Sequence, residues 1–304
     1  MAVSAKVIAD SKFGSTRLIT LEIELHRFIL PELNTHRALS RNFQSSRAVP
    51  VEKMIEQVRN NPAMPVHFGK NQPGMVAGAE GDVFTGIQLW DNAAQMAADF
   101  AEKMHNNGFH KQIVNRLLEP YMWTRGVVTA TYDDWQAFKA LRLHFAAQPE
   151  IKALAVEIDK DIEESSPVQL KEGDWHVPYY GEGVWRDSNY VNGEMKSLYN
   201  KRDKYSTLEN AVKVSASCCA QVSYRKLDDS LEKAERVYDM LNLPENGVYP
   251  DNPPHFSPTE HIARATELDS TYIGHRELSG NFHSRDFIQY RKLLEIGAEG
   301  EYIK

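Results

Sequence analysis

The sequence has little cysteine, and its only two cysteines are neighbours, Cys218 and Cys219. Adjacent cysteines have a poor geometry for a structural disulfide, and two of them fall far short of a zinc ligand set. We therefore expect both thiols to be reduced, in or near a helix.

Long apolar runs and a surplus of basic residues are also missing. No run approaches the roughly 20 apolar residues that span a bilayer, and the first residues lack the apolar core of a signal peptide. We therefore expect a cytoplasmic protein that has no membrane partner. The formal net charge of −7 argues against a general nucleic-acid-binding protein.

The pattern of apolar residues predicts an α+β arrangement rich in helix. Strand-like patterns cover residues 16–30 and 121–132. Helical patterns cover residues 51–61, 90–118, 133–145, 148–166, 207–224 and 230–242. Asp133 or Asp134 is expected to cap the helix that begins there.

Two stretches without clear periodicity lie near residues 62–85 and 167–205, and both are rich in residues that break regular structure. We interpret them as inserted loops within a single domain that spans residues 1–304.

Residues 34–48 (NTHRALSRNFQSSRA) carry arginines and serines but no carboxylate. The arginines are Arg37, Arg41 and Arg47, and the serines are Ser40, Ser45 and Ser46. Forked guanidinium donors and short hydroxyls hold phosphate well. A solvated basic face, or ion pairs with distant carboxylates, would use the same residues, and the spacing leaves both interpretations open.

Arg116 and Arg142 each lie among leucines in a helical pattern. Such an arginine either meets an internal carboxylate or faces a ligand, and chemistry alone favours the ion pair. Gln148 and Glu150 are candidate partners.

The segment HFSPTEH places His255, Ser257, Glu260 and His261 on a proline-stiffened loop. Its histidine spacing does not match a zinc motif, so we predict no metal. Capping of a helix by Ser257, with Glu260 three residues later, is the more economical interpretation.

Three of these segments together resemble the flavin-dependent thymidylate synthases, the thymidylate synthase complementing protein family. The family signature R-H-R-x-x-S-x-N-E-x-S-x-R-Y is similar to THRALSRNFQSSRA, with His36, Arg37, Ser40, Asn42, Ser45 and Arg47 in register. LRLHFAAQPEI resembles a leucine-arginine pair followed by A-Q-x-E-I, and PHFSPTEH resembles G-H-x-[ST]-P-F-E-H.

The order of the motifs is circularly permuted, because the last of them usually comes first. WHVPY and the terminal SGNF and QYRK segments resemble the longer, phage-type branch of the family.

The resemblance implies a flavin-dependent thymidylate synthase-like fold, with helices packed on a mixed or antiparallel sheet. It implies a methyltransferase that converts dUMP to dTMP, with 5,10-methylenetetrahydrofolate as carbon donor and FAD reduced by NADPH as hydride carrier. It also implies a homotetramer whose active sites lie between subunits.

By register, the resemblance assigns roles to individual residues. Arg142 is the catalytic arginine that contacts the uracil. The other nucleotide-binding residues are Gln44, Ser45, Ser46, Arg47 and Arg116. The residues that bind FAD are His36, Arg37, Asn42, His255 and Ser257.

The chain departs from the family at several positions. In the first motif Thr35, Phe43 and Ala48 replace an arginine, a glutamate and a tyrosine. Ala137 stands where a family asparagine approaches the flavin, unless Gln136 takes that place, and Gln221 stands where arginine is common.

Because Phe43 alters the pocket, one alternative is a related FAD- and folate-dependent enzyme that methylates or hydroxymethylates dCMP or dUMP. An alternative of another class is a catalytically silent relative that only binds nucleotide.

Overall fold

The computed structural model describes residues 3–186, 207–223, 227–242, 256–268 and 277–296. Its first sheet joins strands that are distant in sequence, in the order β3-β4-β2-β1-β5. They are β1 (Ser4–Phe13), β2 (Thr16–His26), β3 (Ser40–Phe43), β4 (Trp123–Thr131) and β5 (Val168–Gln169). Only the β1–β5 pair is parallel among them.

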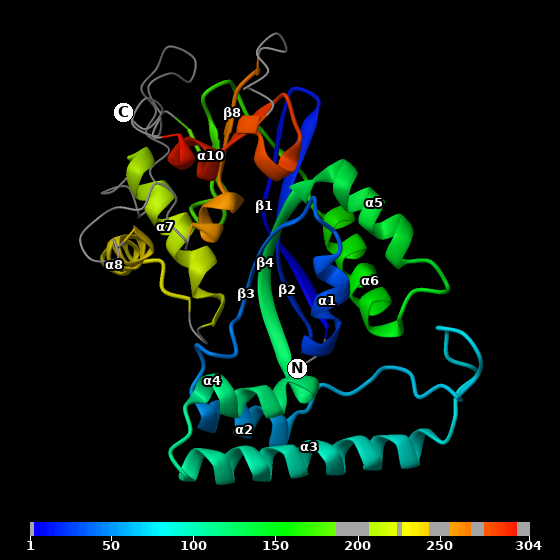
Figure 1. Cartoon of the computed structure of the whole chain (residues 1–304). Coiled ribbons are helices and arrows are strands. Elements are labelled where there is room, and N and C mark those ends of the chain that lie inside the picture. Colours follow the sequence, from blue (N-terminus) through cyan, green and yellow to red (C-terminus); the bar gives the residue numbers. More distant parts are fainter. Residues whose placement is uncertain (1–2, 187–206, 224–226, 243–255, 269–276, 297–304) are drawn as a thin grey trace.

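One face of this sheet carries the main core. Leu21 and Ile23 of β2 are buried on it, as alternation along a strand requires. Helices α5 (Tyr132–Arg142) and α6 (Pro149–Glu164) cover this face together with the short α1 (Leu30–Asn34). Figure 1 shows these helices on one side of the sheet, and α7 (Leu208–Ala220) and α8 (Leu231–Asn242) on the other.

The opposite face packs against the C-terminal part of the chain. Its elements are a second sheet of order β7-β6-β8-β9, the helices α7 (Leu208–Ala220), α8 (Leu231–Asn242) and α10 (Tyr290–Glu295), and the 3-10 turns η6 (Ser257–His261) and η7 (Gly280–Phe282). The strands of the second sheet are β6 (Trp175–His176), β7 (Val184–Trp185), β8 (Ala263–Ala265) and β9 (Phe287–Gln289), all antiparallel.

A buried chain of hydrogen bonds joins the two sheets. His176 contacts Ser11 Oγ through Nδ1 and Thr20 Oγ1 through Nε2, both at 2.8 Å. Thr20 contacts Thr129 at 2.6 Å, and Thr129 contacts Nδ1 of His261 at 2.8 Å. All five side chains are fully buried. Burial lowers the pKa of both histidines to about 3, so they are neutral links in this chain.

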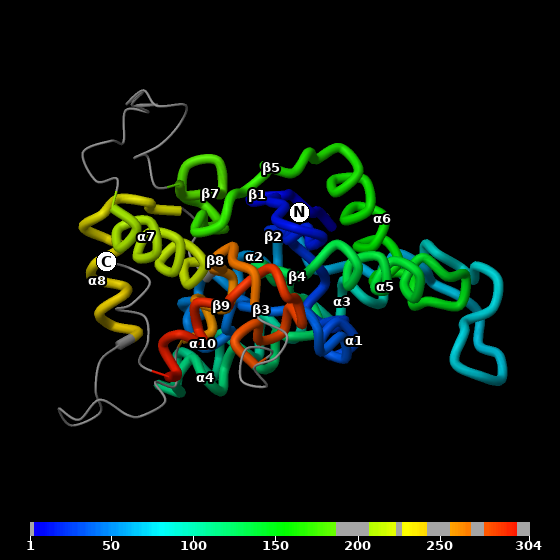
Figure 2. Tube along the Cα trace, turned by 90° about the horizontal axis from the view of Figure 1, so that it is seen from above, coloured from blue at the N-terminus to red at the C-terminus, as the bar shows by residue number. Residues whose placement is uncertain are grey.

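A separate group of helices lies across the end of the first sheet where β4 begins (Figures 1 and 2). It consists of α2 (Val51–Asn60), α3 (Val83–Asn106), α4 (Lys111–Val114) and the 3-10 turn η2 (Asn115–Tyr121), around their own apolar cluster. Along α3, Leu89, Met96 and Phe100 are more than half exposed and lie on one side of the helix.

The α+β prediction is confirmed, and so are the strands and most of the helices. Neither cysteine forms a disulfide with the described residues, and both are buried in α7. The helix expected over residues 90–118 is wrong in extent: it begins at Val83, where the Asp82 side chain caps it, and ends at Asn106. The first expected loop is therefore shorter, and the described part of the second contains β5, β6 and β7.

The predicted cap of α5 is also wrong. The Thr131 hydroxyl accepts the hydrogen bond from Asp134 N at 3.2 Å, while Asp133 and Asp134 lie in the first turn. In the described part of the chain, no helix has both the length and the apolar character of a membrane span.

Candidate functional site

The central feature of the site is a hydrogen-bonded pair of side chains, Arg142 at the end of α5 and His36 just after α1. Arg142 Nε donates to His36 Nε2 at 2.8 Å. Arg142 Nη2 donates to the Glu32 carbonyl at 3.3 Å and to Thr35 Oγ1 at 3.2 Å. The expected partners Gln148 and Glu150 are wrong: the Glu150 carboxylate accepts from Val66 N instead.

The environment of His36 keeps its ring neutral. Burial, and then the charges of Arg142 and Arg41, lower its pKa to about 4. The ring also packs edge-on against Phe138 at a centroid distance of 4.8 Å. Because Nε2 accepts from a guanidinium, the ring proton lies on Nδ1. The pair is therefore a fixed cation held by a neutral acceptor.

Residues assigned to FAD by resemblance lie on both sides of β3. The Asn42 side chain donates to the Cys219 carbonyl at 2.6 Å, and Ser257 Oγ lies 3.5 Å from Asn42 Oδ1. The structure therefore brings two of the motifs together. Ser257 does not cap a helix, because η6 has no side-chain cap. His255 lies outside the described residues.

The donor set fits an anionic cofactor. Arg37 is exposed, and its guanidinium makes no hydrogen bond or ion pair to the described residues. Two further guanidinium groups, those of Arg41 and Arg142, lie beside His36. Such a set of donors suits the diphosphate of FAD. In the described part of the chain, no group of three or more metal-ligating side chains is close enough to hold an ion.

A turn after β3 carries the residues assigned to the nucleotide. Asn115, which is fully buried, donates from its amide to the Ser46 carbonyl at 2.6 Å and to the Val49 carbonyl at 3.0 Å. Ser45 Oγ accepts from Arg47 N at 3.3 Å. The Arg47 guanidinium is exposed and makes no hydrogen bond to the part of the chain described here. The backbone of the turn is thus held by Asn115, whereas the guanidinium of Arg47 is available to a ligand.

Arg116 lies beside this turn in η2 and forms an ion pair with Glu119 at 3.0 Å. The same carboxylate lies 3.4 Å from Arg27, whose Nη1 donates to the Gln44 carbonyl at 2.8 Å. Arg27 and Asn115 were missed by sequence reasoning, since neither belongs to a motif. Only the fold reveals that they hold the turn.

The two ends of the site lie apart within one chain. Ser40 pairs with Thr129, and Phe43 pairs with Gly126 toward the start of β4. Strand β3 alone separates the Arg142 end from the turn by about 10 Å. Arg142 and the turn that carries Arg47 therefore lie toward opposite ends of β3.

Phe43, which replaces the family glutamate, packs within the sheet. A Cβ on Gly126 would lie 2.3 Å from the Phe43 ring, so the ring lies directly over that glycine. The ring faces the main core, on the side opposite to Asn42. Of the other departures, Ala137 is exposed, whereas Gln221 is buried and bonded to Ser217 and Asp228.

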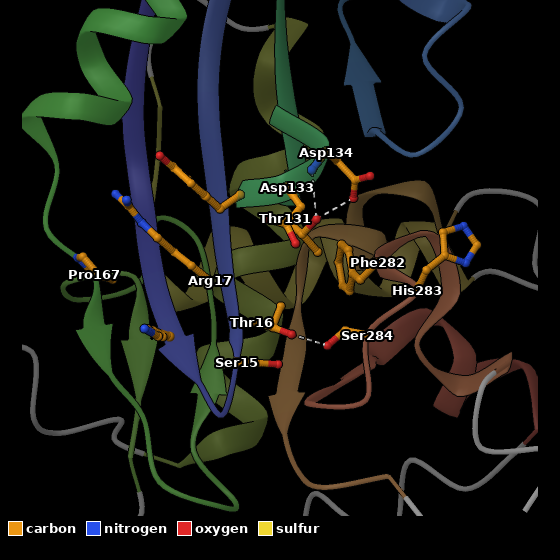
Figure 3. A pocket seen from close by; sticks show the side chains of 12 residues that line it. Ser15, Thr16, Arg17, Thr131, Asp133, Asp134, Pro167, Phe282, His283 and Ser284 are labelled. Carbon is orange, nitrogen blue, oxygen red and sulfur yellow. Dashed lines mark hydrogen bonds between the residues drawn. The ribbon is translucent and has the colours of Figure 1, made fainter. Parts of the chain in front are cut away.

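A cavity of about 560 Å³ opens at the other end of α5, away from Arg142 (Figure 3). In its walls, the hydroxyls of Thr16 and Ser284 share a hydrogen bond of 2.7 Å, and the Thr131 hydroxyl donates to Asp134 at 2.6 Å. No residue that the resemblance assigns to nucleotide or cofactor lines it. Gln136 lines a different, shallow cavity on α5, and its buried side-chain nitrogen has no partner among the described residues.

Comparison with known proteins identifies the family. A family model described as "Thymidylate synthase complementing protein" matches residues 16–168, about half of the 304 residues. A crystal structure of a UMP/dUMP methylase PolB from Streptomyces cacaoi, bound with 5-Br UMP, matches with a TM-score of 0.43 and 15% identity. The match covers 53% of this chain and 89% of that chain.

A second structure of PolB, bound with 5-Br dUMP, matches with a TM-score of 0.39 and 18% identity, covering 49% of this chain and 67% of that chain. The comparison with curated proteins found no match.

Proposed function

The chain belongs to the thymidylate synthase complementing protein family, and we propose that it converts dUMP to dTMP. The proposed reaction consumes 5,10-methylenetetrahydrofolate, NADPH and a proton, and it releases tetrahydrofolate and NADP⁺. The C5–H of uracil is replaced by C5–CH3, with the carbon from folate and the hydride from NADPH. The observation that carries the proposal is the fixed Arg142–His36 pair.

Arg142 is proposed to activate the base. Its Nε and Nη2 are held by His36, Thr35 and a backbone carbonyl, which leaves Nη1 available to a ligand. A guanidinium held in place stabilises negative charge that develops on the uracil without having to reorganise. Because His36 is neutral at pH 7, it holds the guanidinium without neutralising its charge.

His36, Arg37, Asn42 and Ser257 are proposed to hold FAD. The chemistry that bound FAD supplies is hydride transfer from NADPH. Arg37 would donate to phosphate oxygens, while Asn42 and Ser257 offer polar atoms on the other face of β3. His255, assigned by the same motif, completes this proposed set.

The turn after β3 is proposed to hold the nucleotide phosphate, with Gln44, Ser45, Ser46, Arg47 and Arg116 as its residues. The Arg116 side chain is 55% exposed, so its ion pair with Glu119 is worth little and can be exchanged for a phosphate. Arg47 adds a second forked donor.

We also propose a homotetramer in which two copies share each site. The resemblance to the family implies this arrangement, in which the arginine-rich segment of one copy completes the site of another. The exposed apolar residues Leu89, Met96 and Phe100 of α3 support an assembly as well, because such a row is uncommon on a monomer.

Mixing two inactive variants tests the shared site. Arg142→Ala and Arg47→Ala should each lose nearly all activity as pure proteins. Co-expressed chains should regain activity, since mixed assemblies contain sites built from one intact Arg142 and one intact Arg47. No recovery, in mixtures shown by mass spectrometry to contain both chains in one assembly, would contradict sharing.

The reaction itself is tested with the purified protein. A yellow preparation with a flavin spectrum, and a product heavier than dUMP by one CH2 group, are expected. A yellow protein that acts only on dCMP, or that adds an oxygen as well, would point to base modification. A colourless protein that takes up no FAD would instead favour a silent nucleotide-binding relative.

A further inference from the structure

The buried amide of Gln289 connects two segments that are more than 200 positions apart in sequence. Its Nε2 donates to Ser40 Oγ at 3.2 Å and to the Glu260 carbonyl at 3.0 Å. Gln289 is 2% exposed, so neither hydrogen bond competes with bulk water. The two protons of one amide nitrogen therefore join the start of β3 to η6.

Both segments carry residues assigned to FAD. Asn42 follows Ser40 by two positions on the same strand, so their side chains lie on one face. Ser257 precedes Glu260 in η6, and its hydroxyl lies 3.5 Å from the Asn42 side chain. By holding Ser40 and Glu260 together, the Gln289 bridge consequently sets the distance between Asn42 and Ser257.

The C-terminal segment is shaped to hold this amide. Gly280 has a φ of +56°, and a Cβ at this position would lie 2.1 Å from Gln289 Oε1. Only glycine therefore leaves room for the Gln289 side chain. Next to it, Asn281 Nδ2 donates to Ser40 Oγ at 3.3 Å, so that this buried hydroxyl accepts from two amides.

A second contact from the same strand end holds η6. Arg291 Nη1 lies 3.4 Å from the Glu260 carboxylate, and Tyr290 N donates to the Ile262 carbonyl at 2.9 Å. Residues 289–291 therefore contact η6 and the residue after it through backbone and side-chain groups, and of these three residues only Gln289 also bonds to β3.

We propose that Gln289 is a positioning residue for the flavin: it holds the Asn42 and Ser257 segments at the separation that the cofactor needs. Gly280 serves this role by making room for the amide. The inference rests on the proposed function, and it assigns a task to the SGNF and QYRK segments, which the three family motifs do not include.

The test compares FAD affinity in Gln289→Leu and in the wild type, by titration followed through flavin absorbance and fluorescence. We expect the dissociation constant to rise about tenfold or more, since two buried hydrogen bonds are lost. Gln95→Leu is the control, because it removes an amide that bridges α3 to the Arg59 carbonyl, far from β3. It should leave FAD affinity unchanged.

Gly280→Ala separates positioning from general damage. It should weaken FAD binding in the wild type and do so less in a Gln289→Ala background, where the Oε1 and Cδ atoms that its Cβ would meet are absent and only the strain of the positive φ remains. If Gln289→Leu fails to fold, Asn281→Leu removes a single donor to Ser40 and should show a smaller effect of the same kind.

Two results would overturn the proposal. One is unchanged FAD affinity in Gln289→Leu together with a lower melting temperature, which would leave only a structural role. The other is an effect of Gly280→Ala on FAD affinity that is as large in Gln289→Ala as in the wild type. A wild-type protein that takes up no FAD would refute the proposed function itself, and is distinguishable from both.

Discussion

Individual side chains in this protein are held by neighbours that come from distant parts of the chain. Phe43 shows this most directly, because its ring occupies the space that a side chain on Gly126 would need. The aromatic residue at a family glutamate position thus has a structural partner across the strand pair, and the two positions must be considered together.

Gly126→Ala should therefore lower the free energy of unfolding by about 1–3 kcal/mol, since the methyl group displaces the Phe43 ring. Urea unfolding measures this. In a Phe43→Ala background the same change should cost much less. Equal costs in both backgrounds would show that the ring is not what excludes a side chain at Gly126.

The neutral state of His36 predicts a pH dependence. Its pKa in the folded protein, about 4, lies below the 6.5 of an exposed histidine, so the unfolded chain binds more protons between these values. The stabilisation is complete above pH 6.5 and is lost as the pH falls toward 4. We expect a loss of about 1–2 kcal/mol, less than full linkage would predict because the ring is partly exposed.

Urea unfolding at pH 7 and at pH 4.5 tests this for the wild type and His36→Gln, whose amide oxygen can still accept from Arg142. The variant should lose less stability on acidification, because glutamine does not titrate. An identical loss in both proteins would assign the acid sensitivity to other groups.

Among the secondary-structure elements, the hairpin of β1 and β2 depends on a single carboxylate. Asp286 Oδ2 accepts from the backbone nitrogens of Ser15 and Thr16, both at 2.9 Å, and from their hydroxyls at 3.0 and 2.8 Å. Gly14 makes the turn with a φ of +53°, and a Cβ added at this position would collide with the Asp286 carboxylate. The first hairpin is thereby tied to the C-terminal segment.

Asp286→Ala should destabilise the protein by about 3 kcal/mol, because hydrogen bonds to a charged, largely buried group are lost together. Asp133→Ala removes an exposed carboxylate near the same turn and should change stability by no more than about 0.5 kcal/mol. Thermal unfolding of both variants measures the difference. A similarly small effect in both variants would mean that the hairpin does not need its hydrogen bonds to Asp286.

For the whole molecule, the important contact is the buried hydrogen-bond chain between the two sheets. It joins the part of the chain that the family model matches to the C-terminal sheet. Apolar packing alone does not select one register for two sheets, whereas buried hydroxyls and imidazoles that are costly to leave unpaired do. We infer that this network of hydrogen bonds fixes how the two sheets dock.

Thr129→Val keeps the shape of the side chain but leaves His261 Nδ1 without a partner, while Thr20 Oγ1 keeps only its contact with His176. We expect a loss of about 2 kcal/mol in unfolding free energy. Hydrogen exchange should show lower protection in β6 and β8 than in β2 and β4. A loss below about 1 kcal/mol, with uniform protection, would mean that apolar contacts alone dock the sheets.

Local patterns in the sequence predicted most of the elements, because periodicity and proline act over a few residues. They failed at element ends, where one side chain decides, as Asp82 and Thr131 do. Motif register indicated that His36, Arg142 and Arg47 belong to one site. Their roles, the single-domain organisation and the permuted motif order stay predictions.

The sequence by itself therefore determined the fold class, the family resemblance and the cationic character of residues 34–48. Only the tertiary structure decided which side chains meet: Arg142 with His36, Glu119 with both Arg27 and Arg116, and Gln289 with Ser40. The physical reason is that these contacts depend on strand register and on the docking of segments far apart in sequence. No short-range pattern encodes that docking.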